Sequence, residues 1–417
     1  MREMKDSGIE WIGEIPKDWE ITKIGMLYNL RITKVSDTDY APLSVTKMGV
    51  LPQLETVAKT NAHDDRKLVK KGDFVINSRS DRRGSCGISD YYGSVSLINI
   101  VLEPKNNMSS GYYSCLFKTV QFADEFYKNG HGIVDDLWTT GWQDMKRIIL
   151  PVPHYSEQQQ IADYLDTKCS EIDATAEDIQ KEIDLLEDYK KSVITEVVTK
   201  GLNPDAEMKD SGIEWIGEIP KHWKVIRFKY IAIVKSNLVA PIRYMNYPQI
   251  APDVIEKNTG KIISHRSVEE ANVDSWNHLF YKGQILYSKI RPVLNKVVIA
   301  PYDGLCSADM YPISAKENVR FLQYIMLSAF FVKQVDLVTR DRIKMPKINQ
   351  DELGNILLVW TSKEEQQQIA DFLDSKCSEI DSLIADKKRQ LDILADYKKS
   401  LIYEYVTGKK EVPVKDF

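Results

Sequence analysis

The chain has 417 residues, enough for two or more domains that each bury a core. Hydrophobic residues make up 43% of it without forming a long apolar run, which excludes a transmembrane protein, and its first residues show no signal peptide. The five cysteines form no CxxC pair and no metal-ligand cluster, so we expect a reduced, cytoplasmic protein without a metal site. The net charge of −5 taken alone argues against nucleic-acid binding. The charges are unevenly distributed, however, because residues 275–302 hold basic residues and no acid, so nucleic-acid binding stays open.

A 16-residue motif opens the chain and returns in its second half. Residues Met4–Trp19 read MKDSGIEWIGEIPKDW, and residues Met208–Trp223 repeat them with one change. Pro16 and Pro220 disfavour helix just before them, so each motif is predicted to be extended. Its apolar and aromatic residues indicate a structural role, fastening a globular part of the chain to the end of a helix.

Each motif precedes a globular segment, and the two segments differ in sequence but share an order of elements. We expect two strands, an apolar-periodic helix, a loop and a closing strand in each. In the first segment these are Lys70–Ser78, Val95–Leu102, a helix from Tyr113 to Tyr127, and Ile148–Val152. In the second segment they are Tyr281–Lys289, Met310–Ile313, a helix from Leu322 to Val335, and Ile356–Trp360.

A long helix is predicted after each globular segment, beginning at SEQQQIADYLD and at EEQQQIADFLD. Both repeat a narrow apolar stripe, here called the seam, at positions a and d of a heptad, from Ala162 to Val197 and from Ala370 to Tyr405. Ser156 and Ser362 are the expected N-caps. A seam this narrow favours a partner helix, and the chain supplies a matching one, so we expect an antiparallel intramolecular pair. The alternative, a helix packed on an ordinary core, would need a wider stripe.

The predicted fold is therefore α+β, with two mixed α/β domains separated by two long helices that form an antiparallel coiled coil, and with an internal pseudo-two-fold repeat. We expect five segments: a first head (1–155), a first long helix (156–202), a second head (203–362), a second long helix (363–410) and a tail (411–417).

This arrangement resembles the specificity subunits of type I restriction-modification enzymes. The resemblance covers nearly the whole chain and rests on the EQQQIADxLD helix starts, the GEIPKxW motifs, and the alternation of two different heads with two similar helices. It implies that each head is a target recognition domain that reads half of a bipartite sequence in double-stranded DNA. It also implies that the helices set the spacing of the halves and dock two methyltransferase subunits, and that motor-nuclease subunits join for restriction.

The sequence lacks the motifs of these activities. No Asn/Asp-Pro-Pro-aromatic methyltransferase motif and no phosphate-binding GxxxxGK[ST] motif occurs. We therefore expect no catalytic residue and no cofactor on this chain, with S-adenosylmethionine, ATP and Mg²⁺ on partner subunits. Two alternatives stay open: a coiled-coil adaptor whose heads bind proteins, and, disfavoured by the missing motifs, a self-sufficient enzyme.

Candidate DNA contacts gather in two loops of each head, where Arg, Lys, Asn or Ser on short loops can reach base edges and phosphates. A solvated surface charge is the competing interpretation for each residue taken singly. The first head offers Asn77, Ser78, Arg79, Arg82, Arg83 and Tyr91 after a strand, and Trp138 before the closing strand. The second head offers Lys289, Arg291, Asn295 and Lys296 after a strand, and Arg340, Arg342 and Lys344 before the closing strand.

Overall fold

The computed structural model describes residues 2–53, 64–105, 108–132, 138–342 and 344–413. The chain forms two compact units, and each combines one head with parts of both long helices. Unit 1 contains Met1–Ile179 and Arg389–Phe417, and unit 2 contains Gln180–Lys388. The expected tail begins in unit 1, and its last residues, 414–417, lie outside the described part of the chain.

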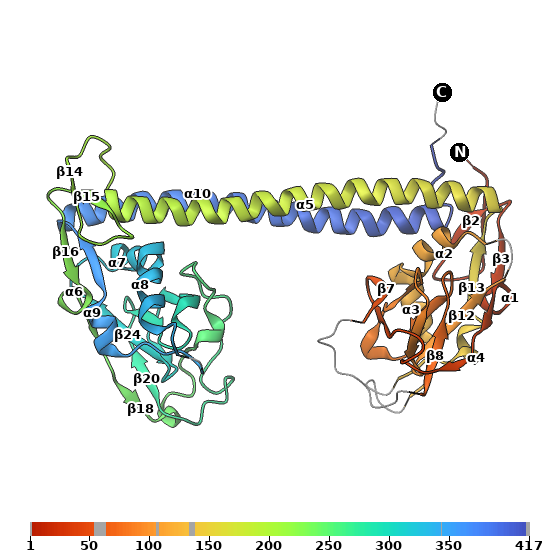
Figure 1. Cartoon of the computed structure of the whole chain (residues 1–417), viewed down its shortest axis with the longest axis horizontal. Helices are drawn as coiled ribbons and strands as arrows, with labels where there is room; N and C mark the ends of the chain where they lie inside the picture. The colour runs from red at the N-terminus through yellow and green to blue at the C-terminus, as the bar shows by residue number, and fades with distance from the viewer. Residues whose placement is uncertain (1, 54–63, 106–107, 133–137, 343, 414–417) are drawn as a thin grey trace. The chain divides into compact units, whose positions relative to one another are not determined.

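In its described residues, the first head contains two main antiparallel sheets, three two-stranded pairs and four helices (Figure 1). One sheet has the order β10-β9-β12-β4, with strands β4 (Tyr28–Leu30), β9 (Phe74–Asn77), β10 (Cys86–Ile88) and β12 (Asn99–Pro104). The other sheet has the order β11-β8-β5, with strands β5 (Lys34–Val35), β8 (Arg66–Val69) and β11 (Gly93–Ser96). The paired strands are β1 (Met4–Asp6) with β2 (Glu14–Pro16), β3 (Glu20–Lys23) with β13 (Ile149–Val152), and β6 (Leu43–Thr46) with β7 (Gly49–Pro52). The helices are α1 (Ile24–Leu27), α2 (Ser110–Phe117), α3 (Val120–Lys128) and α4 (Trp142–Met145).

The second head repeats this plan. Its first sheet has the order β17-β24-β21-β22, with strands β17 (Ala232–Val234), β21 (Ile285–Ser288), β22 (Val297–Ile299) and β24 (Met310–Ala315). Its second sheet has the order β18-β20-β23-β19, with strands β18 (Leu238–Val239), β19 (Gln249–Ile250), β20 (Asn277–Phe280) and β23 (Gly304–Cys306). The pairs are β14 (Met208–Asp210) with β15 (Glu218–Pro220) and β16 (Lys224–Arg227) with β25 (Leu357–Trp360). The helices are α6 (Phe228–Ile231), α7 (Val319–Leu327), α8 (Ala329–Thr339) and α9 (Gln350–Asn355).

The central strands β9 and β21 are buried on both faces. Phe74 and Ile76 of β9 belong to the core shared with α2 and α3, whereas Val75 between them faces a smaller core shared with the second sheet. In β21, Ile285 belongs to the larger core of the second head and Leu286 to its smaller core. Burial on both faces explains why these strands read as continuous apolar runs rather than as alternating patterns. The predicted mixed α/β heads with one order of elements are confirmed.

The structure corrects three predicted elements in the heads. Val95–Leu102 is not one strand but parts of β11 and β12, joined by a turn. The first predicted helix breaks into α2 and α3, because Thr119 caps α3 by accepting a hydrogen bond from the Phe122 N–H at 3.2 Å. The second breaks into α7 and α8 at Ser328, whose extended backbone ends the first helix.

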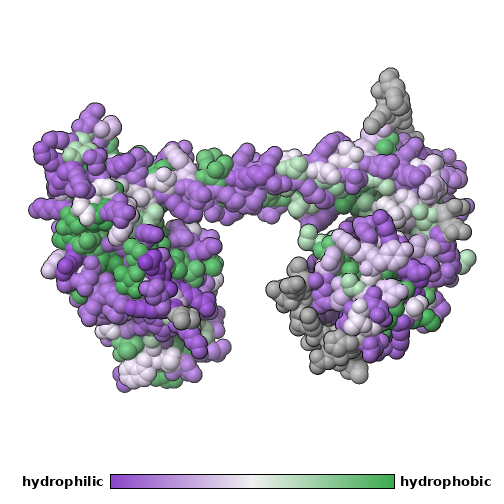
Figure 2. Space-filling view, in the orientation of Figure 1, coloured by the Kyte–Doolittle hydropathy of each residue, from purple (hydrophilic) through white to green (hydrophobic). Residues whose placement is uncertain are grey.

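The long helices α5 (Tyr155–Lys200) and α10 (Lys363–Val406) lie side by side and antiparallel, as predicted (Figure 1). In unit 1 the start of α5 meets the end of α10, where Leu165, Leu401 and Tyr405 share one core and Ile172 packs against it. In unit 2 the end of α5 meets the start of α10. Every predicted seam position is buried or half-buried, while the surface of both helices in Figure 2 is largely hydrophilic.

The predicted cap of α10 is confirmed, because the Ser362 Oγ accepts a hydrogen bond from the Glu365 N–H at 3.3 Å. The predicted cap of α5 is wrong. That helix begins at Tyr155, and its first hydrogen bond runs from the Gln158 N–H to the His154 carbonyl at 2.9 Å, so Ser156 already lies inside it.

The repeated motif fastens each head to a long helix, as its composition indicated. The indole Nε1 of Trp19 donates to the Glu157 carboxylate in the first turn of α5 at 2.9 Å. In unit 2 the indole Nε1 of Trp223 donates to Glu365 in the first turn of α10 at 3.0 Å. Both indoles are buried, so each hydrogen bond satisfies a donor that water cannot reach.

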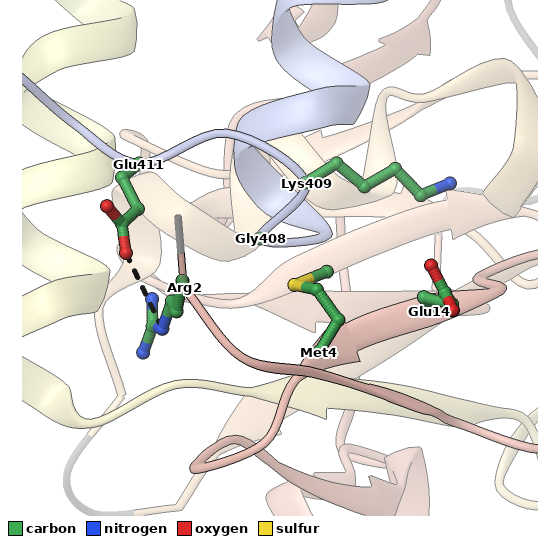
Figure 3. A pocket seen from close by; sticks show the side chains of 6 residues that line it. All are labelled: Arg2, Met4, Glu14, Gly408, Lys409 and Glu411. Carbon is green, nitrogen blue, oxygen red and sulfur yellow. Dashed lines mark ion pairs between the residues drawn. The ribbon is translucent and has the colours of Figure 1, made fainter.

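The one difference between the two motifs changes this junction. Asp18 pairs with Arg2, which also pairs with Glu157, whereas His222 at the matching position contacts Glu365 directly at 2.9 Å. The segment that follows α10 completes the junction in unit 1 around a cavity of about 480 Å³, where the Arg2 guanidinium lies 4.0 Å from Glu411 (Figure 3).

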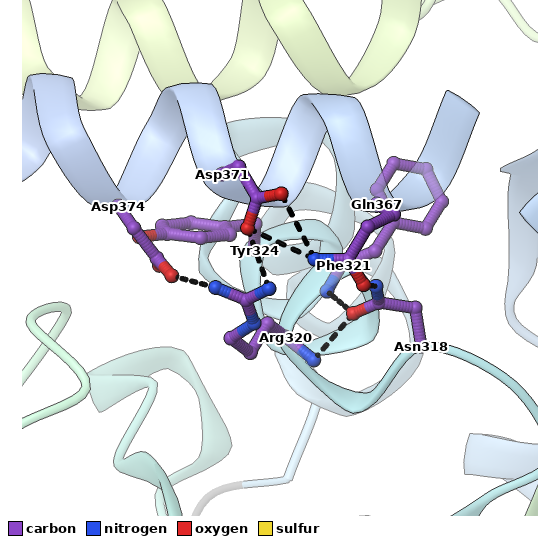
Figure 4. A network of polar contacts seen from close by, with 7 residues as sticks. All are labelled: Asn318, Arg320, Phe321, Tyr324, Gln367, Asp371 and Asp374. Carbon is purple, nitrogen blue, oxygen red and sulfur yellow. Dashed lines mark hydrogen bonds and ion pairs between the residues drawn. The ribbon is translucent and has the colours of Figure 1, made fainter. Parts of the chain in front are cut away.

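An arginine ties helix α7 of the second head to α10. Arg320 of α7 pairs with Asp371 and Asp374, and the Tyr324 hydroxyl donates to Asp374 at 2.7 Å (Figure 4). The first head has Gly111 at the corresponding place in α2, and a Cβ there would lie 2.9 Å from that of Ala162. At this place, close packing of α2 against α5 therefore replaces the ion pair that the second head forms.

Among the described residues, no single helix is both long and apolar enough to cross a membrane, although α7 and α8, bent by 62°, pass that test when taken together.

Candidate nucleic-acid interface

In the first head, the loop after β9 is fixed by its own polar side chains. The Asn77 Oδ1 accepts a hydrogen bond from the Arg79 N–H at 3.0 Å, and the Ser78 hydroxyl donates to the Ile98 carbonyl at 2.6 Å. Arg79 also forms a β-bridge with Thr139, in the loop before the closing strand. The structure therefore brings the two predicted loops together, and it uses Asn77 and Ser78 to hold the exposed Arg79 in place.

The other predicted residues of the first head differ in how far their side chains are free to contact DNA. Arg83 pairs with Asp124 and lies over the Tyr127 ring, with 5.7 Å between guanidinium and ring centroid. Arg82 is exposed, and its Nε lies 3.5 Å from the Asp81 carboxylate. Tyr91 is exposed on the turn before β11. Arg83 is thus occupied within the head, whereas Arg82 and Tyr91 remain accessible.

Trp138 anchors the loop before the closing strand. Its indole Nε1 donates to the Tyr127 carbonyl at 2.9 Å, and the ring fills the space beside Gly130, where any Cβ would lie 2.5 Å from that nitrogen. The Thr140 hydroxyl next to it donates to the Phe126 carbonyl at 2.9 Å. Trp138 is half-buried and positions the loop against α3.

The second head joins the equivalent loops. Ile290 forms a β-bridge with Lys347, and the Arg291 N–H donates to the Pro346 carbonyl at 2.8 Å. The loops after β21 and before α9 are therefore neighbours, as their counterparts are in the first head.

Three predicted contacts in the second head support this loop from within. Asn295 is fully buried and its Nδ2 donates to the Met326 carbonyl at 2.9 Å, so we omit it from the interface. The Lys296 ammonium donates to the Pro252 carbonyl. The Lys289 ammonium lies 5.5 Å from the centroid of the Tyr311 ring. Burial, together with the nearby Lys289 ammonium, lowers the pKa of His278.

The remaining basic residues separate into paired and free ones. Arg342 pairs with Glu352 and donates to the Lys347 carbonyl. No residue that the structure describes pairs with the side chains of four exposed candidates, which are Arg79, Arg291, Arg340 and Lys344. These four cations are the ones best able to meet a polyanion.

Unit 2 holds a second basic cluster, which was not predicted from the sequence. Lys190, Lys257, Lys261 and Lys388 line a cavity of about 370 Å³ beside the long helices. Asp381 pairs with Lys190 at 2.7 Å and with Lys261 at 2.8 Å, so part of this charge is neutralised. No sequence signal placed the turn at 256–261 beside the coiled coil, because the contact depends on how the head folds.

The described residues hold no group of three or more His, Cys, Asp or Glu side chains that could bind a metal ion. The five cysteines are unpaired. Burial raises the pKa of the Cys86 thiol to about 12, so it is not a nucleophile at neutral pH.

Comparison with known proteins agrees with this architecture. Residues 16–185 match the family described as the type I restriction modification DNA specificity domain. The chain is 30% identical over 379 residues to the type I restriction enzyme EcoDI specificity subunit of Escherichia coli, covering 86% of this chain and 81% of that protein. It is 26% identical over 431 residues to the MjaVIII specificity subunit of Methanocaldococcus jannaschii, covering 95% and 94% of the two chains.

The fold also has a solved counterpart. A chain from a structural study of complex assembly and conformational transition of the type I R-M system superimposes with a TM-score of 0.71 at 11% identity, covering 95% of this chain and 99% of that one. The two heads and two long helices are thus a known arrangement, and the chain belongs to the family of type I restriction enzyme specificity subunits, the non-catalytic DNA-recognition subunits of these enzymes.

Proposed function

We propose that each head reads one half of a bipartite DNA sequence and that α5 and α10 set the distance between the halves. The observation that carries this proposal is the recurrence of one loop pair in both heads. A loop after the central strand, β9 or β21, is bridged to the loop before the closing strand, and each pair exposes an arginine whose side chain has no partner among the described residues. The side chains around these arginines differ between the heads, which suits two different half-sites.

Exposed apolar side chains on the long helices support the proposal that two methyltransferase subunits dock there. Leu185 and Tyr189 on α5 are 69% and 50% exposed, and Ile393 and Tyr397 at the matching positions of α10 are 60% and 52% exposed. Large apolar side chains gain nothing from exposure to water, so a patch of them is typical of a protein interface. Two equivalent patches suit two copies of one partner. Motor-nuclease subunits would join this complex for restriction.

The chemistry of modification and restriction is assigned to these partners. S-adenosylmethionine, ATP and Mg²⁺ would bind there, and the chain itself would neither methylate nor cut DNA. The unpaired cysteines are in keeping with a reducing compartment, and we place the complex in the cytoplasm. Family membership sets aside the alternative of an adaptor whose heads bind proteins.

Exchange of one head tests the proposal. Residues 20–150 are replaced by the corresponding head of a relative, and the chain is produced with the methyltransferase of its own system. Mapping of the methylated sites in genomic DNA should show one new half-site and one unchanged half-site. A change in both half-sites would show that the heads do not read independently. DNA affinity should also fall steeply with added salt, since phosphate contacts release counterions.

A further inference from the structure

The loop between β21 and β22 holds two residues in an unusual backbone conformation. Arg291 has φ 43° and Asn295 has φ 46°, on either side of the 3-10 turn Pro292–Leu294. Side chains other than Gly rarely adopt this left-handed region, and Asn tolerates it far better than Arg. At Asn295 the sequence uses a residue suited to the backbone, but at Arg291 it does not.

The surroundings of Arg291 enforce this conformation. Its N–H donates to the Pro346 carbonyl at 2.8 Å, and its own carbonyl accepts from the Leu294 N–H at 2.9 Å. Pro292 beside it is buried, and Asn295 anchors the far end of the turn to Met326. The backbone at Arg291 is therefore fixed from both sides.

The side chain of Arg291 contributes nothing visible to this rigidity. It is exposed, and no described residue forms a hydrogen bond or ion pair with its guanidinium. A strained residue whose side chain supports no part of the fold indicates a use outside the fold.

We propose that Arg291 is a base-reading residue of the second head, which contacts a guanine through its O6 and N7 in the major groove. This inference rests on the proposed function. Arginine can form two parallel hydrogen bonds with these two acceptors, and such a bidentate contact requires accurate placement of the guanidinium. A phosphate contact needs only a nearby cation, and exposed Lys344 and Arg340 suit that role.

Two substitutions separate the reading of a base from the folding of the loop. Arg291→Lys keeps the charge but loses the planar fork. Arg291→Asn removes the cation while placing in the left-handed region a residue that tolerates it, so thermal stability should be unchanged or higher. Lys344→Gln is the matched control, because it removes from the neighbouring loop an exposed cation that has no partner among the described residues.

Each variant of the full chain is produced with the methyltransferase of its own system, and methylated sites are mapped beside those of the wild type. Both Arg291 variants should relax one base-pair position of one half-site, with discrimination there falling roughly 5- to 150-fold, while the other half-site stays unchanged. Lys344→Gln should weaken binding evenly across sequences and reduce its salt dependence.

Three results would overturn the assignment. An even loss of affinity for all sequences in both Arg291 variants would make the residue a phosphate contact. Unchanged recognition in both would make it a solvated side chain. A wild-type complex without any sequence preference would refute the proposed function itself, and the assignment of Arg291 with it.

Discussion

The ammonium of Lys190, a seam residue of α5, lies 2.7 Å from the carboxylate of Asp381 on α10. The same contact recurs with the helices exchanged, between Lys398 on α10 and Asp173 on α5 at 2.6 Å. A single polar residue in a coiled-coil seam fixes how the helices align, because a shifted alignment leaves it without a partner. The repeated pair thus defines one antiparallel alignment in both units.

The two aspartates of this repeated pair should differ in their contribution to stability. Asp381 is bonded by both Lys190 and Lys261 and its side chain is 26% exposed, whereas among the described residues Asp173 pairs with Lys398 alone and its side chain is 64% exposed. Asp381→Asn should lower the free energy of unfolding by about 1–2 kcal/mol. Asp173→Asn, the matched control, should lower it by roughly 0.5 kcal/mol or less. Chemical denaturation measures both, and equal effects would argue against a special role for Lys261.

The contribution of Asp381 to the free energy of unfolding should also depend on pH, and it should be lost at low pH. Burial alone would raise the pKa of this carboxyl, but hydrogen bonds from Lys190 and Lys261 outweigh burial and hold the pKa below its ordinary 3.8. Because the folded pKa is the lower one, the stabilisation is complete above pH 3.8 and disappears as the pH falls through the folded value. The difference between wild type and Asp381→Asn should therefore vanish in strong acid and persist at neutral pH.

The tryptophans that join heads to helices should be more sensitive than their neighbours. Trp223→Phe removes the indole donor to Glu365 and leaves space in a buried site, so it should cost about 2–4 kcal/mol. Trp19→Phe should do the same in unit 1. Trp215 belongs to the same motif but is 41% exposed, and Trp215→Phe should change stability by no more than about 0.5 kcal/mol. Thermal unfolding compares the three variants, and a loss at Trp215 as large as at Trp223 would contradict the junction.

The exposed apolar patches should govern assembly rather than folding. Tyr189→Asp and Tyr397→Asp each place a charge at a position that is about half exposed, so the unfolding temperature of the isolated chain should hardly change. Each variant should lose one copy of the methyltransferase, and the double variant should lose both. The mass of the purified complex gives the answer. Full assembly of the double variant would exclude these patches as the docking sites.

The features that the sequence predicted well depend on local repetition. The seam recurs every seven residues, so the long helices could be predicted from its spacing. The Trp19 motif recurs almost unchanged, and its apolar and aromatic residues indicated that it joins a head to a helix. The break at Ser328 could not, because the apolar spacing runs through it and only the folded backbone ends the helix there.

Which candidate DNA contacts are exposed was harder to predict, because residue type does not reveal what a side chain touches within the fold. Asn295 has the chemistry of a base contact, yet it is buried against Met326. Arg83 is as basic as Arg79, but Asp124 lies close enough to pair with it. These differences arise from contacts between segments far apart in the sequence. The sequence indicated the two loops that lie together in each head, but not which of their side chains stay exposed.

The long helices should act as a ruler for the DNA spacer. Both cross from unit 1 to unit 2, so a change in length must be made in both, after Ile179 in α5 and after Lys388 in α10. Four inserted residues add about 6 Å and turn the helix by about 400°, which keeps the seam facing its partner. Six ångströms is close to two base pairs at about 3.4 Å each. We expect a spacer that is longer by one or two base pairs and two unchanged half-sites.

Insertion of two residues at the same places is the control. It turns each helix by about 200°, so the seam beyond the insertion faces away from its partner and bipartite recognition should be lost. Mapping of methylated sites distinguishes these variants directly. An unchanged spacer after four inserted residues would mean that the distance between half-sites is set elsewhere, by the heads or by the methyltransferase subunits. A longer spacer would show that helical rise is converted into base pairs, because nothing else in the chain has changed.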